Sequence, residues 1–252
     1  VGGGLGARAT GSQSVVVGGD TNYALANHSI VVGGDTNCSC ICGAVVVGGT
    51  CNKSSGCISI IGAGCRNEIC SGGTDASSAI VGGSNNTIGS CYFYNSIVGG
   101  LSNTISPLAS AAFIGGGECN QSNHSNTFVG AGYGLSALAT SAGVAAGRNN
   151  CSCGGFSFIG GGAEQHAEGG HSFVGGGCDN IVTGCTSTIA GGETNCVTGN
   201  YSIVAGGQDN KVTGACSTIG GGRGNLVCEN QSTVAGGDCN IINSASPCSF
   251  IG

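Results

Sequence analysis

Cysteine is the residue type with the greatest capacity for chemistry in this sequence, since the chain contains 18 of them. Cys38, Cys40 and Cys42 alternate along one segment, so an extended chain would place their sulfur atoms on one side of a strand. Cys151 and Cys153 repeat this alternation. Such thiols could stay reduced, form disulfides or bind a metal, although the chain has no C-x-x-C pair of the kind that holds zinc.

The other residues with catalytic capacity form no recognisable constellation. No histidine has the spacing to Ser, Asp or Cys that nucleophilic catalysis needs. The stretch 164–168 is the main local cluster of charge, and we interpret it, like all four histidines, as solvated turn structure. Glycine runs such as 115–117 lack the G-K-[ST] ending of a phosphate loop. We therefore predict no catalytic residue, no metal site and no cofactor. The histidines are His28, His124, His166 and His171.

Asparagine offers a different chemistry, because nine N-x-[ST] sequons occur in the chain. Each is a candidate glycosylation site if the chain passes through a secretory route. The candidates are Asn27, Asn37, Asn52, Asn85, Asn120, Asn123, Asn150, Asn200 and Asn230.

The composition excludes several classes of partner. Only 7% of the residues are charged, and 6 Lys+Arg stand against 12 Asp+Glu, so no basic surface is expected to bind nucleic acid. No run of about 18 apolar residues occurs, so no membrane insertion is expected. The 54 glycines follow no Gly-X-Y period, which excludes collagen.

The sequence repeats itself with a fifteen-residue period. Aligned on the residue that comes third after the double glycine, usually Asn, it contains sixteen copies, and twelve of the intervals between them have the regular length. The other three intervals are longer, by four, two and two positions, and they surround the segment 84–107. A period this short has room for two strands and two turns. It predicts an all-β parallel β-solenoid of about sixteen coils, in a single domain over residues 1–252 with irregular coils at about 68–119.

Two columns of the repeat predict the inside of each coil. Six residues before the anchor, every copy has Val or Ile, and three residues before it every copy has Gly. We expect the Val/Ile column to point inward and stack, and Gly to form the turn. The anchor Asn tolerates a left-handed φ and can bond the turn, and its side chains, stacked in every coil, could form an amide ladder. The predicted core stack includes Val16, Val31, Ile159, Val174, Ile189 and Val204.

Positions that are equivalent in adjacent coils should lie close together. Cys42 and Cys57 are such a pair, with Cα atoms expected about 4.8 Å apart, so we predict them as a candidate disulfide. The extra residues of the long intervals should protrude as loops at Gly72–Ser77 and Cys91–Asn95, with a wider turn near Pro107.

The column next to the core stack should face outward. It holds mainly Val, Ile and Phe, so a single chain would expose an apolar stripe, and such a stripe usually marks an interface. The residues predicted to pack against other copies are Phe113, Phe128, Phe158 and Phe173.

Several segments resemble a known family. Ser14-Val15-Val16-Val17-Gly18 and Ser202-Ile203-Val204-Ala205-Gly206 resemble the S-V-A-I-G core of the head repeats of YadA-like trimeric adhesins. Similar repeats occur in viral and phage tail fibres. The resemblance covers the whole chain and implies a left-handed β-roll, a homotrimer, and surface attachment with a host receptor or glycan as a further partner. Bacterial autotransporters tend to avoid cysteine, so the 18 cysteines favour a virion or extracellular surface fibre.

The predicted function is therefore that of a structural or adhesive fibre or spike segment, and not of an enzyme. The alternatives are an ice-binding solenoid, a bacterial trimeric autotransporter adhesin head and a passive structural filament. Ice-binding solenoids carry a regular Thr column, whereas here Thr is intermittent in the outward column, as at Thr188, Thr218 and Thr233. Neither end shows a capping repeat, so we expect the chain to be part of a longer fibre.

Overall fold

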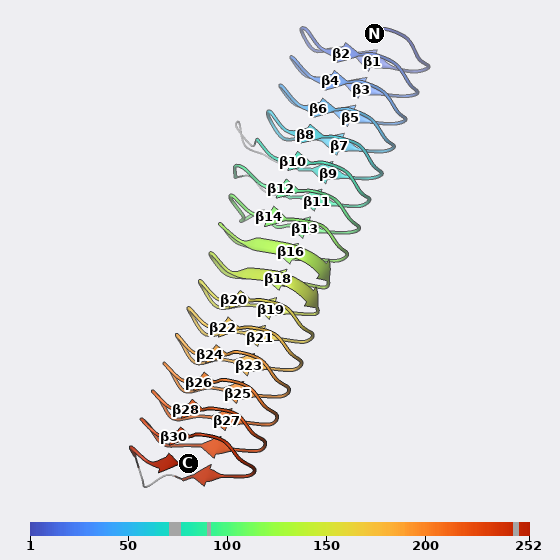
Figure 1. Ribbon diagram of the computed structural model, residues 1–252. Coiled ribbons are helices and arrows are strands. Elements are labelled where there is room, and N and C mark those ends of the chain that lie inside the picture. The colour runs from blue at the N-terminus through green and yellow to red at the C-terminus, as the bar shows by residue number, and fades with distance from the viewer. Residues whose placement is uncertain (71–76, 90–91, 244–246) are drawn as a thin grey trace. The chain divides into compact units, whose positions relative to one another are not determined.

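The computed structural model describes residues 1–70, 77–89, 92–243 and 247–252. Within these ranges the chain is a parallel β-solenoid of about sixteen coils, as the repeat predicts (Figure 1). This part of the chain contains no helix, and hence no helix that could cross a membrane. The chain divides into two compact units, Val1–Tyr133 and Gly134–Gly252, which are described separately.

In the unit Val1–Tyr133, successive strands alternate between two sheets, so each coil gives one strand to each sheet. Neighbouring strands of a sheet are parallel and in register, as Val16↔Val31 illustrates. The odd-numbered strands are β1 (Arg8–Ala9), β3 (Tyr23–Ala24), β5 (Cys38–Ser39), β7 (Lys53–Ser54), β9 (Glu68–Ile69), β11 (Thr87–Ile88), β13 (Thr104–Ile105) and β15 (Gln121–Ser122). The even-numbered strands are β2 (Val15–Val16), β4 (Ile30–Val31), β6 (Val45–Val46), β8 (Ile60–Ile61), β10 (Ala79–Ile80), β12 (Ser96–Ile97), β14 (Phe113–Ile114) and β16 (Phe128–Tyr133).

The unit Gly134–Gly252 has the same two-sheet arrangement, with Ile159↔Val174 and Val174↔Ile189 in register. Its odd-numbered strands are β17 (Ser136–Ala137), β19 (Cys151–Ser152), β21 (His166–Ala167), β23 (Ile181–Val182), β25 (Cys196–Val197), β27 (Lys211–Val212), β29 (Leu226–Val227) and β31 (Ile241–Ile242). Its even-numbered strands are β18 (Gly143–Arg148), β20 (Phe158–Ile159), β22 (Phe173–Val174), β24 (Thr188–Ile189), β26 (Ile203–Val204), β28 (Thr218–Ile219), β30 (Thr233–Val234) and β32 (Phe250–Ile251).

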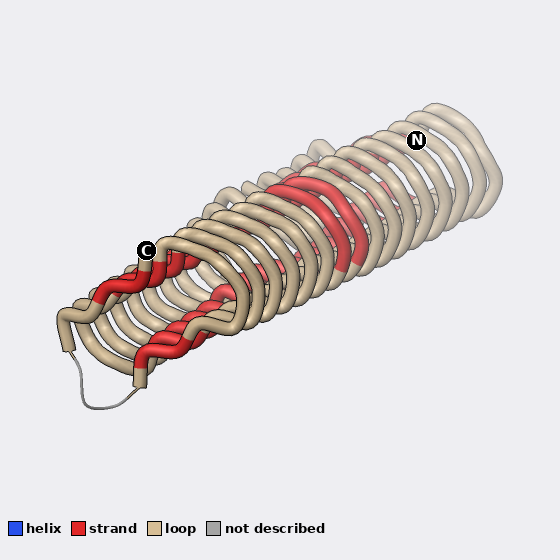
Figure 2. The backbone as a smooth tube through the Cα atoms, turned by 60° about the horizontal axis from the view of Figure 1, so that its bottom comes forward, coloured by secondary structure: helices blue, strands red, loops and turns tan. Residues whose placement is uncertain are grey.

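The core of each unit lies between its two sheets. Side chains alternate along a strand, so each even-numbered strand turns one Val or Ile inward. The opposite column, on the odd-numbered strands, includes Val182 and Val197, which are also fully buried. Figure 2 shows the strands on the two sides of flattened coils. The predicted core residues Val16, Val31, Ile159, Val174, Ile189 and Val204 are each 0% exposed.

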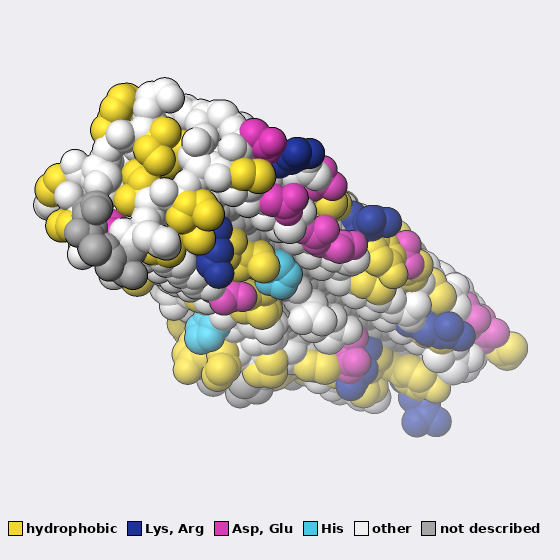
Figure 3. Space-filling model, turned by 90° about the horizontal axis from the view of Figure 1, so that it is seen from below, with side chains coloured by type: hydrophobic (Ala, Val, Ile, Leu, Met, Phe, Trp, Pro, Cys, Tyr) yellow, Lys and Arg dark blue, Asp and Glu magenta, His cyan; other side chains and the backbone are white. Residues whose placement is uncertain are grey.

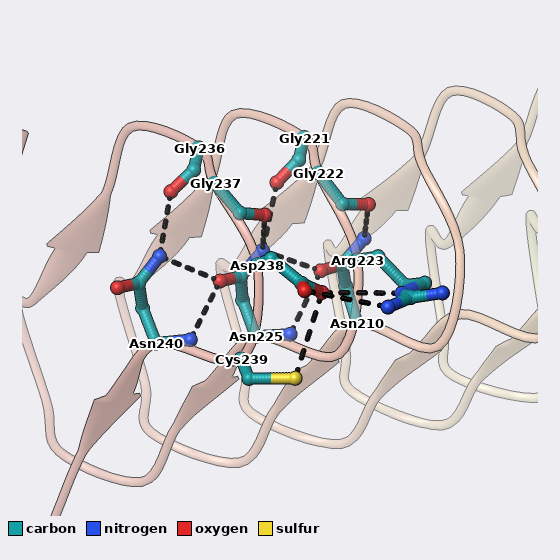
Figure 4. Close-up of polar contacts among 10 residues, drawn as sticks. All are labelled: Asn210, Gly221, Gly222, Arg223, Asn225, Gly236, Gly237, Asp238, Cys239 and Asn240. Carbon is teal, nitrogen blue, oxygen red and sulfur yellow. Dashed lines mark hydrogen bonds and ion pairs between the residues drawn. The ribbon is translucent and has the colours of Figure 1, made fainter.

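The anchor asparagines form a buried ladder of amide groups in each unit. Nδ2 of Asn195 donates to the carbonyl oxygens of Gly191 (3.2 Å) and of Gly207 in the next coil (2.9 Å). Oδ1 of Asn195 accepts the backbone N–H of Asn210 (3.0 Å). The pattern continues through the following coils to Asn240, as Figure 4 shows. Each coil is thus bonded to the next by side chains as well as by the sheets.

The left-handed backbone conformation, which the anchor Asn could also have adopted, lies one residue before the asparagine, whereas the expected amide ladder is confirmed. Thr194, which precedes Asn195, has a φ of 57°. The asparagine is needed for its buried amide, which no shorter or charged side chain would replace. A second column of left-handed residues occupies the opposite turn and includes Ile58 (φ 53°) and Tyr201 (φ 56°).

The constant glycine column is required by the stacking of adjacent coils. Gly192 has a φ of 97°, and a Cβ added there would lie 2.1 Å from the carbonyl oxygen of Gly207. The preceding Gly191 is different, since the nearest atom to an added Cβ is the Gly176 oxygen at 3.9 Å. The first glycine of the pair is therefore replaceable, and the chain has Ala63 in an equivalent position.

A second buried polar ladder runs through the serine column of the repeat, which the sequence did not reveal as internal. Oγ of Ser187 accepts the backbone N–H of Ser202 at 3.1 Å, and Oγ of Ser202 accepts that of Ser217 at 3.1 Å. All three side chains are fully buried. The signal that could have identified it is that the column holds Ser or Ala in every coil except those of Asn95 and Thr127.

The inserted residues lie at one kind of connection, between an odd-numbered strand and the next even-numbered one. The predicted loop Gly72–Ser77 falls outside the described residues except for Ser77, as does Cys91 of the second loop. The exposed segment 92–94 and the turn at Pro107–Leu108 carry the described part of the insertions. The strands on either side keep their register, as in Ile69↔Ile88 and Ile88↔Ile105.

Candidate functional site

The outward side chains of the even-numbered strands form an apolar surface, which we call the even-strand outer face. It consists of the residues immediately before and after the inward Val or Ile of each coil. In the first unit these are Val15, Val17, Ile30, Val32, Val45, Val47, Ile60, Gly62, Ala79, Val81, Ser96, Val98, Phe113, Gly115, Phe128 and Gly130. In the second unit they are Gly143, Ala145, Phe158, Gly160, Phe173, Gly175, Thr188, Ala190, Ile203, Ala205, Thr218, Gly220, Thr233, Ala235, Phe250 and Gly252.

The two columns of this face compensate for each other in size. Wherever the first column has Phe the second has Gly, whereas Val15 is paired with Val17. The ring of Phe113 lies against Gly115, where an added Cβ would be 3.4 Å from a ring carbon. The pairing holds for the Phe coils, whereas the coil of Gly143 and Ala145, between those of Phe128 and Phe158, has two small residues. An apolar sheet surface without charged side chains is suited to packing against another sheet.

The four phenylalanines that were predicted as interface residues all lie on this face. Phe113 and Phe128 stack with ring centroids 5.7 Å apart in the first unit, and Phe158 and Phe173 stack at 6.3 Å in the second. The exposed fractions of Phe128, Phe158 and Phe173 are 43%, 38% and 40%. Their rings are ordered by the stack but still open to solvent, which leaves apolar area for a partner to bury.

The even-strand outer face carries no charge. Among the described residues, Arg148 ends the even-numbered strand β18 beyond this face, and the other Asp, Glu, Lys, Arg, His and Cys side chains lie on turns or on the outer face of the odd-numbered strands. Figure 3 shows acidic and basic side chains next to one another in rows along the surface. The absence of charge distinguishes the even-strand face from the rest of the surface, since charged groups are depleted at the centre of protein interfaces.

The charged positions pair between adjacent coils. Lys53 Nζ lies 2.8 Å from Glu68 Oε1, and Arg223 Nε lies 3.1 Å from Asp238 Oδ1. The hydrogen bond between Lys53 and Glu68 raises the pKa of Lys53 and lowers that of Glu68. Burial, with a hydrogen bond to Glu68, raises the pKa of Cys70 to about 11. Cys70 is therefore a protonated thiol at neutral pH and not a nucleophile.

Two disulfides are formed, and both join cysteines two residues apart on one strand. They are Cys38–Cys40 and Cys151–Cys153. The predicted pairing of Cys42 with Cys57 is wrong, because Cys42 is a free, exposed thiol. In-register coils hold equivalent Cβ atoms about 4.8 Å apart and parallel, whereas a disulfide needs about 3.5–4.5 Å between them.

The structure also corrects the candidate glycosylation sites. Asn37, Asn52, Asn120 and Asn150 are ladder asparagines with fully buried side chains, so a glycan could not be attached to them in the folded chain. Their sequons arise because the ladder Asn is followed two residues later by an inward-facing Ser. The sequon asparagines that reach the surface are Asn27, Asn85, Asn123, Asn200 and Asn230.

The histidines do not form a common site. His166 lies on β21 and not in a turn, which corrects the interpretation of the segment 164–168, and its Nδ1 is 3.8 Å from Glu168 Oε1. His171 stacks on Phe156 with centroids 4.9 Å apart. In the described ranges, no three His, Cys, Asp or Glu side chains are grouped to hold a metal ion.

A scan of protein-family models finds no match to this chain, and a search of curated proteins finds none either.

Proposed function

We propose that the chain is a structural, self-associating segment of a surface fibre, located on a virion or in the extracellular space. The observation that supports this proposal is the largely apolar, charge-free even-strand outer face. A solenoid whose described coils are hydrogen-bonded to one another supplies rigidity, and an apolar sheet face supplies a means of packing chains side by side. The proposed assembly is a homotrimer, a number that rests on the resemblance to trimeric adhesin and fibre repeats.

The role that we propose is mechanical, with no substrate turnover. In the part of the chain that the structure describes, the Asp, Glu, His, Lys and Cys side chains are spread over turns and the odd-strand outer face, and this spread supports a non-catalytic role. A host receptor or glycan remains part of the proposal, as a partner for the turns and the odd-strand outer face once the even-strand faces are packed together.

The test is the association state of the purified chain and of the double variant Phe158→Asp/Phe173→Asp, measured by sedimentation equilibrium. We expect the parent chain to associate and the double variant to remain monomeric, because charges would be buried without partners. Ile181→Asp/Ile241→Asp, with both residues exposed on the odd-strand outer face of the same unit, is the matched control and should associate as the parent does. A monomeric parent chain, or a double variant that associates normally, would refute the proposal.

A further inference from the structure

Four side chains of metal-binding types lie side by side on the outer face of two adjacent odd-numbered strands. Cys151 of β19 is in register with His166 of β21. The residues that follow the inward Ser152 and Ala167 point outward again, because side chains alternate along a strand and both inward residues are fully buried. We call this group the β19–β21 cluster, and it consists of Cys151, Cys153, His166 and Glu168.

The spacing within the cluster suits a single metal ion. The Cα atoms of Cys151 and Cys153 are 5.7 Å apart. Nδ1 of His166 lies 3.8 Å from Oε1 of Glu168, which is too long for a hydrogen bond. A nitrogen and an oxygen that both bind one zinc ion, each at about 2.0–2.2 Å, lie at most about 4.3 Å apart, so this pair is already within reach of one ion. The two cysteines and His166 are half-buried and Glu168 is exposed, so an ion can reach them from solvent.

The disulfide between Cys151 and Cys153 withholds two of the four ligands. A sulfur atom binds a metal as a thiolate, and here the two sulfur atoms are bonded to each other. Reduction would leave the strand in place, because its backbone is held by bonds from Cys151 N to Gln165 O (2.8 Å) and from Cys153 N to Ala167 O (2.8 Å). The neighbouring strand β21 keeps its register with β23 without a disulfide.

Two thiolates, one imidazole and one carboxylate form a complete ligand set for zinc. Zinc in proteins is most often held by four ligands, and Cys, His, Asp and Glu side chains supply them. The thiolates and the carboxylate are anionic, so a divalent cation offsets most of their mutual repulsion. The strands on either side add no positive charge, since Ser136 is in register with Cys151 and Ile181 with His166.

The other disulfide of this chain offers a natural comparison. Cys38 is in register with Lys53, and Ser55 occupies the position next to Cys40. Lys53 is a cation paired with Glu68 at 2.8 Å, and an ammonium group does not bind a metal ion. The first unit therefore has the same pair of cysteines without the imidazole and the carboxylate.

We propose that the β19–β21 cluster is a redox-gated zinc site, which forms when a small-molecule thiol reduces the Cys151–Cys153 disulfide. Two molecules of the thiol give two electrons and two protons to the disulfide and leave as their own disulfide. Zn²⁺ then replaces the protons of both cysteines, which are released to solvent, while His166 binds as the neutral imidazole and Glu168 as the carboxylate. The site does not depend on self-association, because it lies on the odd-strand outer face and not on the even-strand outer face.

The first experiment compares the cysteines of the two disulfides within the same full chain. The chain is reduced with dithiothreitol, desalted without air, incubated with zinc chloride or with EDTA, and labelled with N-ethylmaleimide for increasing times. Peptide mass spectrometry should show that zinc slows the labelling of Cys151 and Cys153 by about tenfold or more and that of Cys38 and Cys40 by less than about twofold. Equal protection of both pairs, or no protection of Cys151 and Cys153, would overturn the inference.

Substitutions at the other two ligands test their assignment. His166→Gln and Glu168→Gln should each bring the labelling rate of Cys151 in zinc to within about twofold of its rate in EDTA. Lys211→Gln is the matched control, because Lys211 occupies the same column as His166 but is in register with Cys196, outside the cluster. A His166→Gln or Glu168→Gln variant that is protected as well as the parent would refute that residue as a ligand and overturn the four-ligand site.

The gate is tested by counting the zinc ions that the full chain retains against a chromophoric chelator before and after reduction. Reduction should add one zinc per chain in the parent and in Cys38→Ser/Cys40→Ser, and none in Cys151→Ser/Cys153→Ser. A parent chain that gains no zinc on reduction would overturn the inference, as would an equal gain in the two double variants.

Discussion

Replacing one ladder asparagine by alanine should destabilise the chain severely, and the structure allows the cost to be worked out for Asn195. The substitution removes Oδ1, which accepts the buried backbone N–H and the Nδ2 group of Asn210. It also removes Nδ2, whose two hydrogens are shared among the oxygens of Gly191 and Gly207 and Oδ1 of Asn180. The Gly207 oxygen keeps the N–H of Glu193 (2.9 Å), so it is not orphaned. The Asn210 N–H loses its acceptor, at about 1–3 kcal/mol, and the two lost amide donations add about 0.5–1.5 kcal/mol each.

The expected loss is therefore about 2–6 kcal/mol in the free energy of unfolding, which corresponds to a fall of roughly 4–24 °C in Tm for a chain of this size. Differential scanning calorimetry and urea unfolding followed by circular dichroism would measure it. Asn200→Ala is the matched control, because exposed Asn200 makes a single inter-coil bond through its side chain, to Cys185 N (2.9 Å). Its expected cost is about 0.5–1 kcal/mol. Equal costs for the two substitutions would refute the argument that the buried ladder holds the coils together.

Three further predictions concern the columns of the coil. Gly192→Ala should cost about 3–5 kcal/mol, because its Cβ would lie 2.1 Å from the Gly207 oxygen. The neighbouring Gly191→Ala should be neutral or slightly stabilising. Equal melting temperatures of the two variants would contradict the roles assigned to the two glycines. Val174→Asp should cost about 4 kcal/mol or more, since it places a charge without a partner in the core stack, and a variant that melts within about a degree of the parent would show that the column is not core. Ile58→Gly should stabilise the chain by about 1 kcal/mol by relieving the left-handed φ of a β-branched residue, as Gly43 does one coil earlier, while Ile58→Ala should not; urea unfolding of both variants decides.

The arrangement of the coil could be predicted from sequence because the repeat compares one position with itself sixteen times. A column that holds only Val and Ile in every coil, such as that of Val174, must lie in the core, because an exposed column would also contain polar residues. The same comparison identified the phenylalanines of the outward column. The short, constant period predicted two strands per coil, and the structure shows two.

The roles of individual polar residues could not be obtained in this way. The repeated asparagine predicted an amide ladder and also allowed a left-handed φ at the asparagine, and the structure confirms the ladder but places the left-handed φ on the preceding residue, Thr194. The N-x-S sequon likewise does not distinguish a buried from an exposed asparagine, since it occurs both at Asn150 inside the coil and at Asn200 on the surface. Cysteine pairing depends on Cβ directions, and these favour Cys38 with Cys40 over Cys42 with Cys57.

The central claim, that chains pack through the even-strand outer face, is tested most directly by the mass of the purified chain in solution under reducing conditions. Multi-angle light scattering should give three times the 24.0 kDa of a single chain for the proposed homotrimer. The Phe158→Asp/Phe173→Asp variant should return the mass of one chain. A parent chain that elutes with the mass of a single chain at all concentrations would contradict the account, because the apolar face would then remain in water with nothing to cover it.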